Sequence, residues 1–503
     1  MAGREGRAPT YYSPEEWAQL LVDPVREELR ARGEAPDLDR IRALFPPTAG
    51  DPAFDARAIA RGIDRLETEP TVDTGHPFLD LSVKTGLAHI DLTFQGDHPK
   101  YGVKRYAESI HDGFPPTIIA AVDALSAWGL HARAAQLFRY WLTHFVRDDG
   151  TIDYYGPSIS EYGMLLATAA LLLERAGGQG WWEDGFPALD RMARHLLRLR
   201  AEAEKADGLL SGVPEADTRK DVGKYFHNNA WAAKGLSRWA EACGRASASP
   251  ATSAPTMRDV ASGIARDTLA AIARTWPQPR AAGSCPSPGT RPDAGAGPLN
   301  GAAAPQERPR SLGLSWPNAA GVPRSKSSRW IQAPAGQEKR GFPEDWWLPP
   351  QVEPVARPEF LTASTLGSYT NYRYWPELLS SGLLPSGLAD RVVASRLRAG
   401  GQFCGMTRLG SGLDDWPLAE YLTGLQHLGR REDFLLSLYG HVAYHQAGGH
   451  LTAYEQISAP PCRERAPYCL PAQLVAARAA RLLVEEEGPA PGPSAPRDAL
   501  DQA

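Results

Sequence analysis

The sequence predicts an all-α protein, an (α/α)6 toroid of six helical hairpins interrupted by a disordered insertion rich in proline and glycine. Three observations support this fold class. Apolar residues recur with helical periodicity along most of the chain. The turns between successive helices are short, which makes the helices antiparallel neighbours. Five such hairpins precede a final helix, and residues 77–94 supply a partner for that helix, so the pairs complete a ring.

The predicted helices follow one another in order. Two precede the ring, at 13–32 and 51–67, and the first has Ser13 as a suitable N-cap and Pro14 as a suitable first residue. Residues 164–173 are apolar on all sides, which predicts an inner helix. The hairpins are 116–128 with 131–145, 158–175 with 185–203, 226–243 with 256–275, 375–382 with 388–399, and 417–428 with 432–444, and the last helix is 471–485.

The domain organisation follows from these helices. The chain has 503 residues, with 48 Gly and 44 Pro, and many of these glycines and prolines lie in 277–350 and after 487. Such segments cannot bury a core. Without them about 400 residues remain, the scale of one toroid. We therefore expect a helical extension at 1–76, a catalytic toroid at 77–487 with a disordered insertion at 277–350, and a disordered tail at 488–503.

Composition excludes several classes of protein. The net charge of −5 argues against a nucleic-acid-binding surface. No apolar run is long enough for a membrane span, and the N-terminus has no apolar signal segment, so a cytoplasmic protein is expected. The five cysteines form no CxxC pair, and no nucleotide-binding motif is found. We expect no cofactor and no metal.

Loops at one end of a helical ring are where function is expected. The loop 149–162 contains Tyr154, Tyr155 and Glu161. Aromatic rings stack on the faces of sugars, and carboxylates bind their hydroxyl groups. An Asp-Gly turn and a capped helix explain other residues of this loop but not the paired tyrosines. The loop therefore predicts a carbohydrate site.

A second loop carries Glu215, Asp217 and Arg219, and the next helix begins with a polar run. That run is His227, Asn228 and Asn229, and capping a helix needs only one of the three. We expect these side chains to face the ring and bind substrate. The alternative for Glu215 and Asp217 is an ordinary exposed polar loop.

Two adjacent carboxylates and a tryptophan, Asp414, Asp415 and Trp416, precede the helix 417–428. We expect them to bind and stack a sugar, although Asp415 could simply cap the helix that Pro417 opens. His441, His445 and His450 could suggest a metal. Helix and loop histidines are the favoured interpretation, because no cysteine or carboxylate stands at ligand spacing.

Glu455 lies between Tyr454 and Gln456 in a segment with little other charge. Glu215 and Glu455 are far apart in sequence, and each precedes an inner-type helix, so a ring brings both to the same mouth. Two carboxylates facing one cavity are the minimum for glycoside hydrolysis, and inverting enzymes separate them by roughly 6.5–9.5 Å. The sequence therefore predicts a two-carboxylate site.

The sequence resembles the six-hairpin glycosidases, the superfamily of glucoamylase, trehalase and related inverting enzymes. The resemblance implies that Glu215 is the general acid and Glu455 the general base, and that Asn371, Tyr372 and Arg373 contact the sugar. Glucoamylases carry Trp-Glu-Glu around the acid where this chain has Pro-Glu-Ala-Asp, so Asp217 is an alternative acid. The matching stretches are 212–217, 226–232, 369–377 and 452–456.

Together these observations predict an inverting glycoside hydrolase that acts on a glycan or oligosaccharide. Three alternatives stay open. A phosphorylase on the same toroid would replace the base by phosphate, and a polysaccharide lyase would prefer Tyr, His and Arg to paired Glu. A non-catalytic sugar-binding or scaffold protein would bind without turnover.

Overall fold

The computed structural model describes parts of the chain that belong to one of its two compact units, Asp55–Pro279 with Ser327–Ala503. The other unit lies outside the described residues. So do the predicted helices at 13–32 and 51–67, the tail, and the insertion apart from Trp347–Leu348. The described ranges are 72–107, 111–154, 159–176, 180–214, 222–245, 254–275, 347–348, 352–353, 359–360, 370–399, 401–409, 412–446, 451–458 and 468–486.

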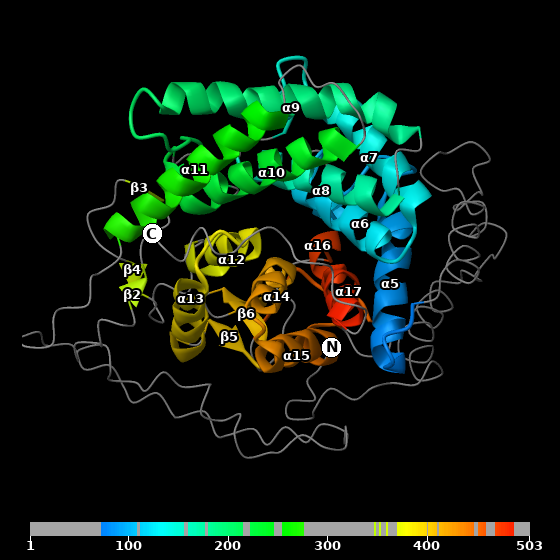
Figure 1. The fold of residues 1–503 in the computed structure, drawn as a ribbon. Coiled ribbons are helices and arrows are strands. Elements are labelled where there is room, and N and C mark those ends of the chain that lie inside the picture. The colour runs from blue at the N-terminus through cyan, green and yellow to red at the C-terminus, as the bar shows by residue number, and fades with distance from the viewer. Residues whose placement is uncertain are drawn as a thin grey trace, which may run out of the picture. The chain divides into compact units, whose positions relative to one another are not determined.

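Helices make up most of the described residues, as the all-α prediction requires (Figure 1). Each predicted helix in these ranges is found, and most boundaries agree within two residues, but the predicted last helix 471–485 is divided at Leu474 into two helices. They are α5 Pro77–Thr93, α6 Pro115–Ala127, α7 His131–Phe145, α8 Ser160–Ala176, α9 Trp181–Ala203, α10 Phe226–Arg245, α11 Ala254–Thr275, α12 Trp375–Ser381, α13 Ser386–Ala399, α14 Leu418–His427, α15 Arg431–Gly440, α16 Leu470–Gln473 and α17 Val475–Glu486.

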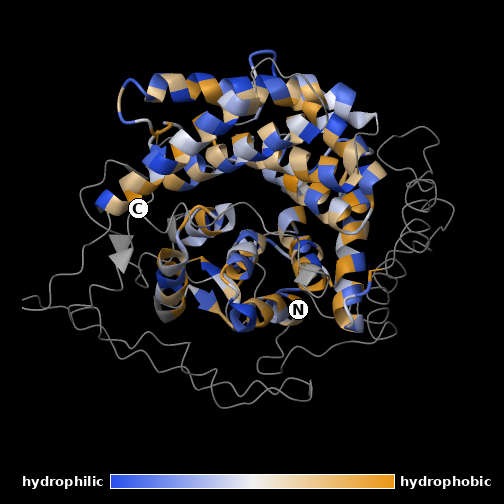
Figure 2. Cartoon of the chain, viewed as in Figure 1, coloured by the Kyte–Doolittle hydropathy of each residue, from blue (hydrophilic) through white to orange (hydrophobic). Residues whose placement is uncertain are grey.

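Burial differs between the helices as an inner and an outer layer require. Most residues of α6 and α8 are buried, whereas α9 exposes charged residues on one face. Figure 2 shows hydrophilic and hydrophobic residues side by side on most helices. α9 begins four residues earlier than predicted, because Trp181 and Trp182 are both buried and extend its apolar stripe.

Six helices contact one another in a closed order. α6 packs on α8, α8 on α10, α10 on α12, α12 on α14, α14 on α17, and α17 again on α6. Other helices lie against these, with α7 on α6, α9 on α8, α11 on α10, α15 on α14 and α5 on α17. No helix in the described ranges is long and apolar enough to cross a membrane.

Glycine permits the closest of these helix crossings. A Cβ atom on Gly163 of α8 would lie 2.0 Å from the carbonyl oxygen of Trp231 in α10. A Cβ on Gly235 of α10 would lie 2.3 Å from the carbonyl oxygen of Gly163. The two backbones therefore touch, which only residues without a side chain allow.

A small antiparallel sheet was not predicted. Its order is β5-β6-β7-β8, and Asp414 in β7 pairs with Gln456 in β8. Residues 369–375, predicted as a loop, include a π-helical turn, η8, and the predicted helix 432–444 ends in a second one, η9. The bounds are η2 Lys104–Ala107, β1 Lys224–Tyr225, β2 Trp347–Leu348, β3 Val352–Glu353, β4 Glu359–Phe360, η8 Thr370–Tyr374, β5 Gln402–Phe403, β6 Met406–Leu409, β7 Gly412–Asp414, η9 His441–His445 and β8 Gln456–Ser458.

Candidate active site

Glu455 is held by two tyrosines that come from a distant part of the chain. The hydroxyl of Tyr101 donates to Glu455 Oε1 at 2.6 Å, and the hydroxyl of Tyr106 donates to Oε2. Burial raises the pKa of Tyr101 well above its usual value, and the nearby Cys469 and Glu455 raise it further. The Tyr101 hydroxyl therefore stays protonated at neutral pH. Two such donors favour the ionised form of the carboxylate.

Asp414 lies beside Glu455 because strands β7 and β8 are paired. The Tyr372 hydroxyl donates to Asp414 Oδ1 at 2.6 Å, and the backbone N–H of Trp416 donates to the same atom at 3.2 Å. Asp414 is only 4% exposed. Burial, and then the charge of Glu455, raise the pKa of Asp414 well above its ordinary value. Ionisation of Asp414 is therefore disfavoured beside the charge of Glu455.

Aromatic rings line this pair of carboxyl groups. Tyr101, Tyr106, Phe114, Tyr372 and Trp416 belong to one buried cluster, against which Tyr154 packs. The rings of Phe114 and Tyr154 are stacked with centroids 5.2 Å apart. Tyr154 remains partly exposed. The predicted aromatic residues Tyr154, Tyr372 and Trp416 thus meet at the Glu455 site.

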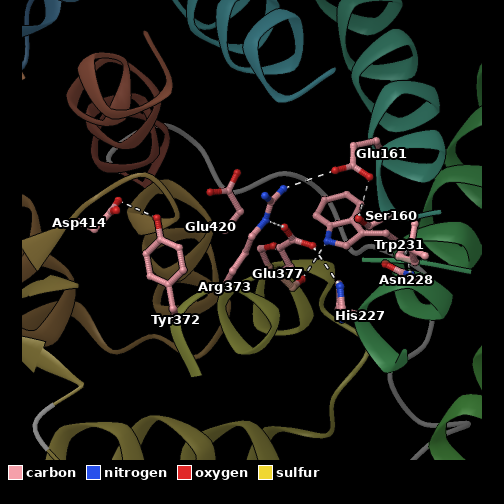
Figure 3. Close-up of polar contacts among 12 residues, drawn as sticks. Ser160, Glu161, His227, Asn228, Trp231, Tyr372, Arg373, Glu377, Asp414 and Glu420 are labelled. Atoms are coloured by element: carbon pink, nitrogen blue, oxygen red, sulfur yellow. Dashed lines mark hydrogen bonds and ion pairs between the residues drawn. The ribbon is translucent and has the colours of Figure 1, made fainter. Parts of the chain in front are cut away.

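A buried ion network adjoins the cluster (Figure 3). Arg373 Nη2 lies 3.4 Å from Glu161 Oε1, and Arg373 Nε donates to Glu377 Oε1. The guanidinium carbon lies 3.9 Å from the centre of the Trp416 ring. Burial opposes the charge of Arg373, but Glu377 and Glu161 outweigh it and raise the pKa of Arg373. The network therefore connects α8, η8 and α12 to the aromatic cluster.

Glu377 was not identified from the sequence, although Arg373 and Glu377 stand at the i, i+4 spacing of helical ion pairs. Glu377 is 1% exposed. Burial raises the pKa of Glu377 to about 7, with Arg373 opposing the shift and Glu161 adding to it. Glu377 therefore changes its protonation state near neutral pH.

His227 and Asn228 begin α10 and face this network. Both are fully buried, and the ring of His227 stacks on Tyr374 at 4.3 Å. His227 Nε2 lies 3.8 Å from Glu377 Oε2, too far for a hydrogen bond. Burial lowers the pKa of His227 to about 3, so the ring is neutral. Four buried polar atoms here have no hydrogen-bond partner among the described residues. They are both ring nitrogens of His227, Asn228 Oδ1 and Glu377 Oε2.

Asn229 and Asp415 are occupied by bonds within the protein. The Asn229 amide accepts from the Leu210 N–H at 2.8 Å and donates to the carbonyls of Leu210 and Tyr225. Asp415 accepts from the Thr407 N–H at 2.8 Å and from His441 Nδ1 at 2.9 Å. Its side chain does not cap α14, whose N-terminus has no side-chain cap, so that interpretation is wrong.

Several predicted site residues lie outside the described part of the chain. They are Tyr155, Glu215, Asp217, Arg219 and the side chain of Asn371. The loop that carries the two predicted acids leaves and returns beside α10, where Gly212 and Gly223 form a β-bridge. The carbonyl of Tyr454 accepts from His445 Nε2 at 2.7 Å, and Gln456 pairs with Asp414.

The histidines that raised the question of a metal make other contacts. His441 and His445 both approach Asp415, and His450 lies outside the described residues. Over the described ranges, no group of three His, Cys, Asp or Glu side chains could hold a metal ion.

Comparisons with known proteins do not assign a family. No protein-family model matches the sequence, and no curated protein matches it. Among solved structures, a wild-type glycosidase has 12% identity and a TM-score of 0.47, covering 86% of this chain and 98% of its own. A glycosidase variant in complex with glucose has 11% identity, a TM-score of 0.47 and the same coverage. A rhamnosidase from Klebsiella oxytoca with rhamnose bound has 12% identity and a TM-score of 0.48, covering 82% of this chain and 65% of that one.

Proposed function

We propose that this protein is a glycoside hydrolase that inverts the anomeric centre of a glycan or oligosaccharide, with Glu455 as general base. One observation carries the proposal. The Glu455 carboxylate accepts hydrogen bonds from two tyrosine hydroxyls beside the buried Asp414, in a cluster of aromatic rings. An ionised carboxylate next to stacking rings is what activation of water against a sugar requires.

We propose further that the domain is the six-hairpin toroid. The proposal is supported by the closed series of helix contacts, from α6 through α8, α10, α12, α14 and α17 back to α6. Glu455, Asp414 and the first turn of α10 then lie at one mouth of the ring. The loop with Glu215 and Asp217 starts and ends at that turn, which would bring an acid to the same mouth.

The reaction would proceed in one displacement. Glu455 takes a proton from a water molecule as the water oxygen bonds to the anomeric carbon. The bond from that carbon to the glycosidic oxygen breaks, and Glu215, or Asp217 in its place, gives a proton to the leaving oxygen. Tyr101 and Tyr106 orient the Glu455 carboxylate toward the water. Tyr154 and Trp416 stack against the sugar, and Asp414 binds one of its hydroxyl groups.

The charges of the described residues of the site, which do not include Arg219, favour a neutral sugar. Arg373 is already paired with Glu161 and Glu377, and Asp414 accepts a hydrogen bond from the backbone N–H of Trp416, whose ring Arg373 contacts. A lyase must bind a uronate and a phosphorylase must bind phosphate, and both need uncompensated cations. The arrangement therefore supports hydrolysis.

The test is a screen of aryl glycosides and neutral oligosaccharides with wild type and Glu455→Gln. We expect hydrolysis by wild type and a loss of at least about 10³-fold in kcat for the variant. Glu183→Gln, on the exposed face of α9, is the matched control and should retain activity. Undiminished hydrolysis by Glu455→Gln would remove Glu455 as base.

Further measurements separate the alternatives. NMR of the product anomer tests inversion, and comparison of Glu215→Gln with Asp217→Asn identifies the acid. An unsaturated product that absorbs in the ultraviolet would indicate a lyase. Dependence of turnover on phosphate would indicate a phosphorylase. Binding of glycans without turnover would indicate a sugar-binding protein.

A further inference from the structure

Two π-helical turns contact the consecutive aspartates at the end of strand β7. Turn η8 contacts Asp414, and turn η9 contacts Asp415. Tyr372 of η8 donates to Asp414. His441 and His445 of η9 both approach Asp415, and their rings are stacked at 5.4 Å with an angle of 20°. Asp414 ends β7 and bonds to Tyr372 of the site, whereas Asp415, just after the strand, lies against the two histidines. π-Helical turns are rare and often occur at functional sites.

Asp415 joins η9 to the small sheet. It is fully buried and accepts from the Thr407 N–H of β6 at 2.8 Å. Because a carboxylate only accepts, His441 must donate its Nδ1–H across the 2.9 Å contact. Both His441 and Asp415 are thus fixed in the interior, where their bonds are protected from water.

His445 continues this chain to the loop of Glu455. Its Nε2 lies 2.7 Å from the carbonyl oxygen of Tyr454, which can only accept, so the proton is on Nε2. Its Nδ1 lies 3.3 Å from Asp415 Oδ2. Burial lowers the pKa of His445, with Asp415 opposing, and the ring is neutral at neutral pH. A hydrogen bond from this ring therefore helps to hold Tyr454, the residue before Glu455, which also forms a β-bridge with Tyr468.

The loop that is held in this way is strained. Leu451 has φ of 50°, in the left-handed region that residues other than glycine rarely adopt. Such a conformation persists only where the surroundings over-determine it. Gln473 supplies two bonds, accepting from the Ala453 N–H at 2.7 Å and donating to the Leu451 carbonyl at 2.9 Å. β-Bridges from Gln446 to Ala453 and from Tyr468 to Tyr454 add to these, and His445 supplies a side-chain bond at Tyr454, next to Glu455.

We propose that His445 and Asp415 are positioning residues that keep the Glu455 carboxylate in register with Asp414. The inference rests on the proposed function, because it concerns the placement of the general base. The connection runs by hydrogen bonds from Thr407 to Asp415 and from Asp415 to His441, by ring stacking from His441 to His445, and by a hydrogen bond from His445 to the Tyr454 carbonyl. Neither positioning residue touches substrate. A displacement of about 1 Å at a reacting group costs on the order of 10²-fold in rate.

The test compares His445→Leu with His445→Gln. Leucine removes the donor to Tyr454, whereas the glutamine amide can donate to the same carbonyl. We expect kcat to fall about 10²-fold for His445→Leu with KM within about twofold of wild type, and His445→Gln to recover about tenfold of that loss. His144→Gln is the matched control, because exposed His144 makes a similar contact to the Tyr140 carbonyl at 2.8 Å on α7.

Hydrogen exchange gives a readout that needs no substrate. Amides in 451–458 should exchange faster in His445→Leu than in wild type or His445→Gln, while peptides of α8 and α10 stay unchanged. If His445→Leu does not fold, Asp415→Asn tests the same connection one step earlier, since Thr407 and His441 use different oxygens of Asp415 and the amide keeps only one of them.

The outcomes separate this inference from the proposed function. If no glycan is hydrolysed by wild type, the proposed function fails, and faster exchange confined to 451–458 still supports the anchor. Unchanged exchange in that peptide overturns the anchor, whatever the activity. An equal loss of kcat in His445→Leu and His445→Gln, or a loss confined to KM, also overturns it.

Discussion

Glu377→Gln should change how the stability of this protein depends on pH. Wild-type Glu377 is buried beside Arg373, and its pKa is raised to about 7. A carboxyl group whose pKa is higher in the folded than in the unfolded state holds its proton in the fold. Its contribution to stability is therefore present below the unfolded pKa and is lost as pH rises through the folded pKa. Glutamine mimics the protonated form at every pH.

The magnitude follows from the shift. The pKa rises from 4.5 to about 7, which at about 1.4 kcal/mol per pKa unit corresponds to roughly 3 kcal/mol. Near pH 4 to 5, the variant and wild type should have similar free energies of unfolding. Near pH 9, the variant should be more stable by roughly 3 kcal/mol, because wild type must bury a second carboxylate beside Glu161.

The assay is urea unfolding of wild type and variant at about pH 5 and about pH 9. The difference between the two proteins isolates the titration of Glu377, since all other groups are shared. Glu183→Gln, an exposed change of the same chemistry, should show no such pH dependence. A variant advantage that stays below about 1 kcal/mol at pH 9, or that grows toward acid, would refute the reasoning.

Two further predictions concern the fold and the site. Gly163→Ala should destabilise the protein by about 3 kcal/mol or more, because the new Cβ would lie 2.0 Å from the Trp231 carbonyl oxygen. Urea unfolding measures this loss. A loss under about 1 kcal/mol would show that α8 and α10 separate easily. Tyr101→Phe should move the acid limb of the pH–rate profile to higher pH, because a hydrogen bond to a charged group is worth about 1.5–3 kcal/mol and Glu455 loses one. An unchanged profile would contradict a role of Tyr101 in holding the Glu455 carboxylate.

The helices were largely determined by local sequence. Periodic apolar residues and a two-residue turn predicted a helix at 131–145, and α7 occupies the same residues. The polar start of α10 was also visible. Its local pattern did not distinguish Asn229, whose amide bonds to Leu210 and Tyr225, from Asn228, whose oxygen faces the ion network without a bond.

Tertiary structure decided how the site is assembled. Strands of two to four residues carry too little periodicity to be predicted, yet the pairing of β7 with β8 sets Asp414 beside Glu455. Asp414 and Asp415 differ because the first, at the end of β7, bonds to Tyr372, and the second, just after the strand, bonds to His441. Glu377 acquires its raised pKa from burial and from Glu161 on another helix. Burial and charge at a point depend on segments hundreds of residues away, and a local pattern holds no information about them. The sequence by itself determined the helices and predicted Glu455 as the candidate base. Packing decided which carboxyl groups have a raised pKa, which accept hydrogen bonds, and which lie together in the site.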